Sequence, residues 1–148
     1  MNINNAGRKL IRTYEGCKLK AYKCSAGKNT IGFGNTFFED GSAVQMGDTI
    51  TKDRADALFI IILDGFANNA RTLIKQSITD NQFSALVSFA YNAGIGAFKS
   101  STLLKKVNTN PNDPAIRLEF AKWDKAGGKV LTGLTRRRAA EAELYFTT

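Results

Sequence analysis

Residues 15–35 read EGCKLKAYKCSAGKNTIGFGN, and this stretch decides how the N-terminal part of the chain folds. Residues 18–23 alternate in polarity, small residues occupy positions 25–27, and residues 29–34 form a second run typical of a strand. Period-two alternation that is interrupted by a glycine-containing turn is typical of a β-hairpin. We therefore predict two antiparallel strands joined by a short turn.

Three side chains with useful chemistry lie in or beside this predicted hairpin. Glu15 ends the preceding helical pattern, and the hairpin would fold Cys24 and Thr30 back towards it. A carboxylic acid, a thiol and a hydroxyl would then line one groove. The chain contains no His and no spacing typical of metal ligands, so we expect neither a metal nor another cofactor.

The spacing of these residues resembles the phage lysozymes (endolysins) of glycoside hydrolase family 24, of the lambdoid-phage kind. That family is marked by Glu, eight residues, Asp or sometimes Cys, five residues and Thr, which Glu15, Cys24 and Thr30 match. The sequence TIGFG at residues 30–34 matches the family's Thr-Ile-Gly-aromatic-Gly. Cys24 stands where Asp is usual, and Asn35 stands where His is usual.

The resemblance continues along the chain in the family's order. Residues 81–89 read NQFSALVSF, similar to the family's Asn-Gln-aromatic-x-Ala-Leu-x-Ser-Phe. Phe98 precedes residues 101–103 (STL) at the usual distance, and residues 136–141 read RRRAAE, similar to the C-terminal Arg-Arg-Arg-x-x-Glu. Motifs that recur in order over nearly the whole chain are more specific than any one of them.

Hydrophobic periodicity and capping residues predict a mostly helical chain, with a capping box formed by Thr79 and Gln82, and with helix ends at Gly94 and at residues 127–128. The predicted helices cover residues 4–14, 51–74, 82–92, 97–107, 114–123 and 135–146, and residues 35–50 are predicted to be irregular. The resemblance implies an α+β, lysozyme-like fold in one domain, residues 1–148. A small N-terminal lobe with the hairpin (15–50) and a larger helical lobe (75–148 with 4–14) would be joined by a long helix (51–74), with the active-site cleft between the lobes.

Composition limits the other possibilities. A chain of 148 residues with 43% hydrophobic residues suits one globular domain. Its longest apolar stretch, residues 57–63, is far too short to span a bilayer, and the N-terminus lacks the apolar region of a signal peptide. The net charge of +8 fits binding to nucleic acid or to acidic cell-wall polymers, and charge alone does not choose between them.

Two cysteines, Cys17 and Cys24, do not make a disulfide framework. A bridge between them would occupy the thiol at the key position. We favour two reduced thiols in a protein that accumulates in the cytoplasm.

The resemblance implies a role for each residue of the hairpin motif in cleaving a glycosidic bond. Glu15 would protonate the leaving oxygen, and an apolar neighbourhood would raise its pKa to suit an acid near neutral pH. Thr30 would hydrogen-bond the attacking water. Cys24 would act in place of Asp only as a thiolate, and Lys23 and Lys28 are near enough in sequence to lower its pKa. The alternative is an inert Cys24 in a catalytically impaired wall-binding homologue.

The helical lobe would supply further contacts. Tyr91, Asn92 and Ser101 match family positions that line the cleft, and we expect them to bind substrate. We expect Phe98 and Trp123 to lie in the core. Arginines at 136–138 occupy three successive helix positions and cannot share one face, so we expect at least two of them to face solvent.

The resemblance also implies a biological role. The protein would be a muramidase that cleaves the β-1,4 bond between N-acetylmuramic acid and N-acetylglucosamine in peptidoglycan, lysing the host and releasing phage. It would act as a monomer, bind no nucleic acid, insert stably in no membrane, and wait in the host cytoplasm for a holin to open the way to the wall. A basic nucleic-acid-binding module is the less favoured alternative, because no signature of a known nucleic-acid-binding scaffold is present.

Overall fold

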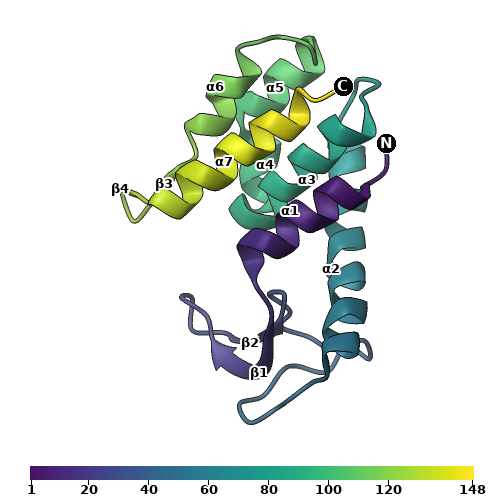
Figure 1. Ribbon diagram of the computed structural model, residues 1–148, viewed down its shortest axis with the longest axis vertical. Coiled ribbons are helices and arrows are strands. Elements are labelled where there is room, and N and C mark those ends of the chain that lie inside the picture. The colour runs from purple at the N-terminus through teal and green to yellow at the C-terminus, as the bar shows by residue number, and fades with distance from the viewer. The chain divides into compact units, whose positions relative to one another are not determined.

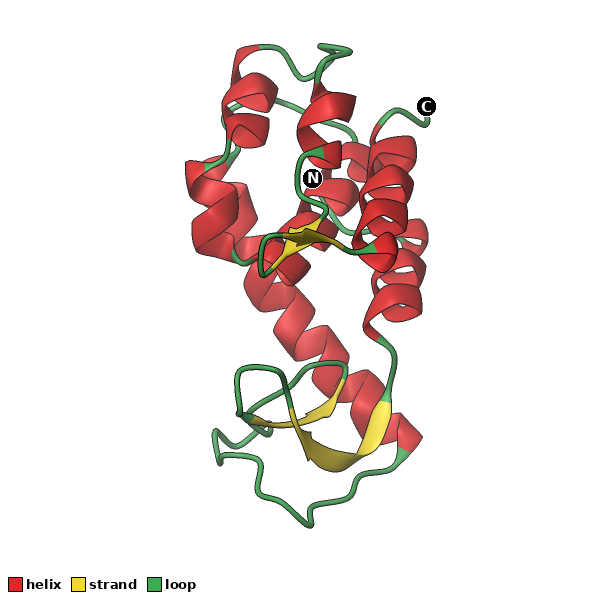
Figure 2. Ribbon diagram, turned by 90° about the vertical axis from the view of Figure 1, so that its left-hand side faces the viewer, coloured by secondary structure: helices red, strands yellow, loops and turns green.

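The computed structural model describes residues 1–148, which form two compact units. The helical unit consists of Met1–Tyr14 and Phe66–Thr148, and the hairpin unit consists of Glu15–Gly65. Helix α2 (Lys52–Leu73) contributes residues to both units. Strands are confined to two short hairpins, one in each unit, and the rest is helix and loop (Figures 1 and 2).

The hairpin unit contains the predicted antiparallel pair, β1 (Lys18–Lys23) and β2 (Asn29–Gly32). The other edge of β1 is paired as well, because Ala21 N–H donates to Asp48 O at 2.9 Å and Ile50 N–H donates to Leu19 O at 2.8 Å. Between β2 and α2 the chain forms no helix or strand, only isolated bridges. The predictions of a hairpin and of an irregular segment after it are confirmed.

A small apolar core supports this hairpin within its unit. Ile31 and Phe33 point inwards from β2 and the turn after it, and Leu58 and Phe59 meet them from α2, all at most 3% exposed. The Phe33 and Phe59 rings lie 4.9 Å apart between centroids. This packing fixes the face of β2 that carries Ile31, so Thr30 projects from the opposite face of the strand.

The helical unit is built around one central helix. The remaining helices are α1 (Asn5–Glu15), α3 (Asp80–Ala93), α4 (Ile95–Ser100), α5 (Thr102–Thr109), α6 (Ile116–Ala121) and α7 (Thr132–Tyr145). Every residue from Gln82 to Tyr91 of α3 is buried, and α7 packs along α3 (Figure 1). No helix combines the length and the apolarity needed to cross a membrane.

The start of α3 confirms the capping box predicted from the sequence. Gln82 N–H donates to the Thr79 hydroxyl at 3.1 Å, and Thr79 N–H donates to the Gln82 side chain at 3.0 Å. These reciprocal bonds satisfy two backbone donors that a helix start otherwise leaves without partners. At the other end Gly94 takes a φ of +100°, which a residue with a side chain rarely adopts, and the helix stops there as predicted.

The helix predicted over 97–107 is wrong, because the chain forms two helices that meet at Ser101. Ser101 is extended (φ −73°, ψ 148°) and caps α5, where its Oγ accepts from Leu104 N–H at 3.1 Å. The same hydroxyl donates to Phe98 O at 2.7 Å. Because the Ser101 hydroxyl bonds to the backbone at the end of α4 and at the start of α5, it favours a break over one continuous helix. Hydrophobic periodicity does not reveal this break.

The helix predicted over 114–123 is also shorter in the structure, and a hairpin follows it. Helix α6 ends at Ala121, and β3 (Lys125–Ala126) pairs with β4 (Lys129–Val130) across Gly127 and Gly128. Both glycines have positive φ, 59° and 79°. The two glycines therefore form the turn of a hairpin, whereas the sequence predicts only a helix end there.

Candidate functional site

The hairpin unit contains all three members of the predicted catalytic set. Glu15 is the last residue of α1 and is half-buried, and Gly16, with φ +68°, turns the chain towards β1. Cys24 begins the turn of the hairpin, and Thr30 lies on β2, 3% exposed. The structure therefore places the Glu-Cys-Thr motif on one short, continuous segment of a single unit.

The turn of the hairpin holds the Cys24 backbone tightly. Cys24 N–H donates to Lys28 O at 2.9 Å, and Gly27 N–H donates to Cys24 O at 2.8 Å. Gly27 has a φ of +79°, which lets the chain reverse within five residues without strain. These bonds extend the strand ladder by one step, so the alternation of side chains continues as far as Cys24.

Hydrogen-bond donors around the Cys24 thiol lower its pKa. The largest cause is the backbone N–H of Lys28, followed by the Thr30 hydroxyl and the N–H of Ala26. Such donors favour the thiolate over the thiol. The charges of Lys23 and Lys28 are not among these causes, in contrast to the sequence expectation, and Lys28 acts through its backbone.

The Thr30 hydroxyl carries a single proton, and in this structure it donates that proton to Lys28 O at 2.9 Å. It therefore cannot donate to the Cys24 thiolate at the same time, and the backbone N–H groups are the lasting cause of the lowered pKa. The same orientation leaves the lone pairs of the Thr30 oxygen as acceptors. Cys17 and Cys24 are both free, half-buried thiols.

Asn35, which stands where the family usually has His, has a structural role in this unit. It is 5% exposed, and its Nδ2 donates to Leu58 O of α2 at 3.1 Å. Its backbone exchanges two hydrogen bonds of 2.9 Å with Ile31. Asn35 thereby ties the turn after β2 to α2, and its buried Oδ1 has no hydrogen-bond partner.

The three predicted substrate-binding residues belong to the helical unit and differ in accessibility. Tyr91 is 9% exposed and packs on Phe66 with ring centroids 5.0 Å apart, and Ser101 is 4% exposed with its hydroxyl used between α4 and α5. Asn92 alone is exposed. Its Oδ1 accepts from Arg138 Nη2, so the amide NH₂ is the end left to contact a ligand.

A hollow of about 380 Å³ opens beside Asn92 in the helical unit. Its lining comes from the end of α3, the β3–β4 hairpin and α7: Asn92, Ala93, Trp123, Lys125, Ala126, Leu131, Leu134 and Arg138. Trp123 packs edge-on against Phe89 at 5.3 Å yet is 37% exposed, so the prediction of a core tryptophan is wrong. Its position just after the end of α6 leaves one side of the ring uncovered. Phe98, by contrast, is fully buried as predicted.

The expectation that two of the three arginines at 136–138 face solvent is wrong. Arg137 and Arg138 are each 2% exposed, and Glu141, one turn further along α7, is fully buried between them. Glu141 accepts from both guanidinium groups, with 3.2 Å between Arg137 Nε and Glu141 Oε2, and from the Ser88 hydroxyl at 2.5 Å. These four residues, Ser88, Arg137, Arg138 and Glu141, form the Arg–Glu cluster that joins α7 to α3.

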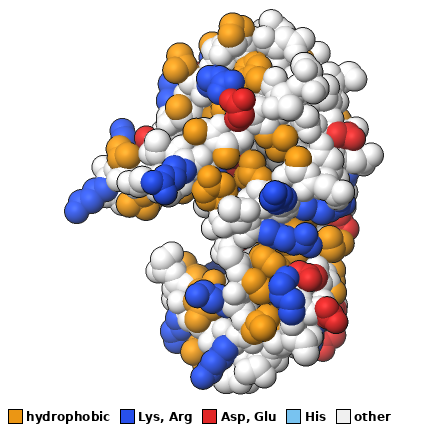
Figure 3. Space-filling view, in the orientation of Figure 1, with side chains coloured by type: hydrophobic (Ala, Val, Ile, Leu, Met, Phe, Trp, Pro, Cys, Tyr) orange, Lys and Arg blue, Asp and Glu red, His pale blue; other side chains and the backbone are white.

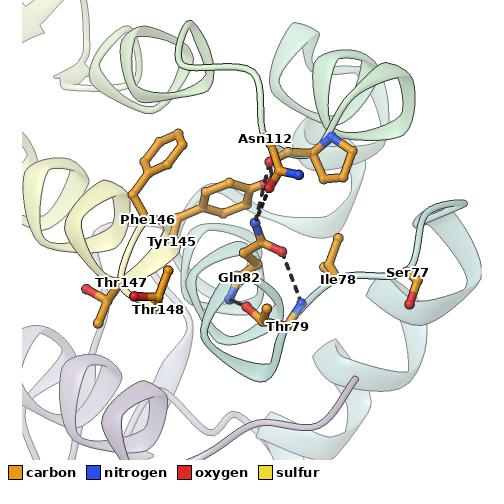
Figure 4. Close-up of a pocket in the computed structure, with 10 residues that line it drawn as sticks. Ser77, Ile78, Thr79, Gln82, Asn112, Tyr145, Phe146, Thr147 and Thr148 are labelled. Carbon is orange, nitrogen blue, oxygen red and sulfur yellow. Dashed lines mark hydrogen bonds between the residues drawn. The ribbon is translucent and has the colours of Figure 1, made fainter.

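A larger hollow of about 570 Å³ lies elsewhere in the helical unit, around the start of α3 and the C-terminal residues (Figure 4). The polar groups that line it form hydrogen bonds within the protein. Thr79 and Gln82 form the capping box, and the Tyr145 hydroxyl donates to Pro111 O at 2.7 Å. The hollow contains no carboxylate or thiol side chain, so its size does not make it a centre for hydrolysis.

Basic side chains are spread over the face of the molecule drawn in Figure 3, and acidic ones are fewer. The chain has 21 Lys and Arg against 13 Asp and Glu, which gives the net charge of +8. Such an excess attracts polyanions in general. It does not select one class of polyanion.

Comparisons with known proteins agree with the motif pattern. A family model described as phage lysozyme matches residues 12–141. The chain is 43% identical over 147 residues to an endolysin of Bacillus phage PZA, covering 98% of this chain and 55% of that protein. It is 41% identical to an endolysin of Acyrthosiphon pisum secondary endosymbiont phage 1, with 98% of each chain covered. The chain thus spans about half the length of its Bacillus phage relative.

A solved structure, the muramidase domain of SpmX from Asticaccaulis excentricus, superposes with a TM-score of 0.88. The two chains are 34% identical, and the match covers 99% of each. The likeness extends over both the hairpin unit and the helical unit.

Proposed function

The chain belongs to the phage lysozyme family, and we propose that it hydrolyses the β-1,4 bond between N-acetylmuramic acid and N-acetylglucosamine in peptidoglycan. The observation that carries this proposal is the placement of Glu15, Cys24 and Thr30 on one continuous segment, at the end of α1, in the hairpin turn and on β2. Backbone donors in that turn also lower the pKa of the Cys24 thiol. A thiolate at the usual Asp position retains the negative charge that the reaction uses there. The relatives named endolysin and the muramidase domain support the same substrate class.

In the proposed mechanism Glu15 is the general acid. It transfers its proton to the glycosidic oxygen as the bond to the anomeric carbon breaks, and positive charge develops on the sugar. The Cys24 thiolate accepts a proton from the attacking water, whose oxygen bonds to the anomeric carbon. The proton on Cys24 then returns to Glu15 through solvent, which restores both groups.

Thr30 orients the water in this scheme. Because its own proton is donated to Lys28 O, the Thr30 oxygen accepts a hydrogen bond from the water. The water then directs one hydrogen to Thr30 and one to Cys24.

Asn92 is the proposed direct substrate contact from the helical unit, through its exposed amide NH₂. Tyr91 and Ser101 are nearly buried, so we propose that they act on substrate binding by holding the ends of α3 and α5 in place. The proposed lobes are residues 15–50 and 75–148 with 4–14, joined by the helix at 51–74.

In the host cell the proposed role is that of an endolysin for phage release. The protein would accumulate as a monomer in the cytoplasm and reach the wall after a holin permeabilises the membrane. Its positive charge would then serve attraction to the acidic wall and not binding to nucleic acid.

A catalytically impaired wall-binding homologue is the second candidate, because a neutral thiol at position 24 is a poor base. Incubating the protein with purified peptidoglycan distinguishes the two candidate functions. The muramidase generates new reducing ends and soluble muropeptides, whereas the impaired homologue sediments with the wall and releases neither. If the protein neither sediments with peptidoglycan nor releases products from it, the proposed substrate is wrong.

A further inference from the structure

Tyr22 shares a face of the hairpin with two members of the proposed catalytic set. It is the register partner of Thr30 in the antiparallel pair. Directly opposed residues place their side chains on the same face, with Cβ atoms about 4.5–5.5 Å apart. Cys24 is two residues further along, and the bond from its N–H to Lys28 O continues the ladder, so its side chain projects on that face as well.

Each of the other three tyrosines makes a contact that gives it a structural role, whereas the Tyr22 hydroxyl makes none. Tyr145 donates its hydroxyl to Pro111 O, Tyr91 packs on Phe66, and Tyr14 lies beneath Arg137. Tyr22 is half-buried, and its phenol hydroxyl makes no hydrogen bond within the protein. A half-buried phenol usually finds a partner, so its donor is available to a bound molecule.

The electrostatic surroundings of Tyr22 include two members of the proposed catalytic set. Burial raises the pKa of Tyr22, and negative charge on Cys24 and on Glu15 raises it further. The charges of Lys18, Lys20 and Lys23 on the same strand are not among the causes. Tyr22 therefore lies near both the proposed acid and the proposed base, and it stays protonated as a donor at neutral pH.

We propose that Tyr22 is a positioning residue for the hydrolysis, and that its phenol hydroxyl donates a hydrogen bond to the attacking water. Both hydrogens and both lone pairs of that water then have a partner. One hydrogen goes to the Cys24 thiolate and one to the Thr30 oxygen, while one lone pair accepts from Tyr22 and the other attacks the anomeric carbon. The Thr30 hydroxyl already donates its proton to Lys28 O, so it cannot be the donor to this water. This inference rests on the proposed muramidase function.

Tyr22→Phe tests the proposal because it keeps the ring and removes only the donor. We expect kcat on soluble peptidoglycan fragments to fall about 3- to 10-fold, the range for one hydrogen bond, with KM unchanged. The melting temperature should stay at the parent value, since the lost hydroxyl has no partner in the protein.

Tyr145→Phe is the matched control, because it also deletes one phenol hydroxyl but removes a hydrogen bond inside the helical unit. We expect it to lower the melting temperature and leave kcat unchanged. A Tyr22→Phe protein with kcat within twofold of the parent would overturn the proposal. So would a rise in KM at constant kcat, which indicates substrate binding, or a loss of activity matched by a fall in melting temperature. If the parent itself generates no reducing ends, the proposed function fails instead.

Discussion

The hairpin turn around Cys24 and the Arg–Glu cluster use polar groups in opposite ways. In the cluster, two arginines and a serine surround the fully buried Glu141, and α7 is joined to α3 by their hydrogen bonds. At the hairpin, backbone N–H groups favour the Cys24 thiolate while the thiol stays partly exposed. A buried charge whose hydrogen-bonding groups are all paired stabilises the fold. An accessible group that only receives hydrogen bonds from donors on one side changes its pKa and stays able to react.

The largest expected effect is on catalysis at the hairpin unit. Glu15→Gln keeps the shape of the side chain but cannot protonate the glycosidic oxygen, so release of reducing ends should fall about 10²- to 10⁴-fold. The melting temperature should change little. A Glu15→Gln protein that lyses permeabilised cells at the parent rate would remove Glu15 from the role of acid.

The next largest effect is on stability at the Arg–Glu cluster. Glu141→Ala leaves Arg137 and Arg138 buried without their carboxylate, which should lower the free energy of unfolding by about 3–5 kcal/mol. Denaturant unfolding measures this loss. The control is Glu143→Ala on the same helix, whose carboxylate is exposed and pairs with Arg117 at 3.4 Å, and which should cost less than about 1 kcal/mol. Equal losses would mean that burial does not distinguish the two glutamates.

Substitutions at Cys24 test whether its one-sided pairing is used in catalysis. Cys24→Ser cannot ionise in the working range and should lose about 10²-fold in rate, the lower end of general base catalysis. The thiolate is the major form only above the lowered pKa of Cys24, so the parent should lose activity as the pH falls through that pKa. Cys24→Asp should extend activity to lower pH, since an ordinary Asp titrates near ~3.9.

A thiol-alkylating reagent checks the same point. Both cysteines are half-buried, so the comparison uses proteins in which Cys17 is replaced by Ser. The reagent should inhibit the protein that retains Cys24 and should not inhibit the protein with Cys24→Asp. If Cys24→Ser lyses as well as the parent at every pH, the thiol is a spacer and Glu15 works with Thr30 and water alone.

The smallest expected effect concerns the whole surface. The net charge of +8 should attract the protein to an acidic wall, and salt screens that attraction over about 8–10 Å at moderate ionic strength. Lysis of whole walls should slow several-fold between low and moderate salt, whereas hydrolysis of short soluble fragments should change less. The same salt dependence on both substrates would show that long-range attraction is not what the charge supplies.

Local signals in the sequence predicted the elements that depend on neighbours in the chain. The alternation at 18–23, the small residues at 25–27 and the strand-like run at 29–34 specify a hairpin, because turn chemistry and strand periodicity are short-range properties. The capping box of Thr79 and Gln82 was visible for the same reason. The order of the motifs along the chain is enough to identify the family, which the match over residues 12–141 confirms.

Other features depended on contacts between distant residues. The sequence at 136–138 is a run of three arginines, and only the packing of α7 on α3 decides that Arg137 and Arg138 are buried around Glu141. Trp123 was expected in the core, and its exposure follows from where α6 ends. The cause of the lowered Cys24 pKa was also hidden, because it is a backbone N–H brought close by the turn and not a charged side chain.

The sequence by itself thus determined the hairpin, most of the helices and the residues of the Glu-Cys-Thr motif, because spacing along the chain encodes them directly. Only the tertiary structure decided which charged groups are paired, which polar groups keep a free donor, and how Tyr22 relates to Thr30 across the two strands. The physical reason is that burial and hydrogen bonding are shared between segments far apart in the chain, and a one-residue change in strand register would turn Tyr22 to the other face.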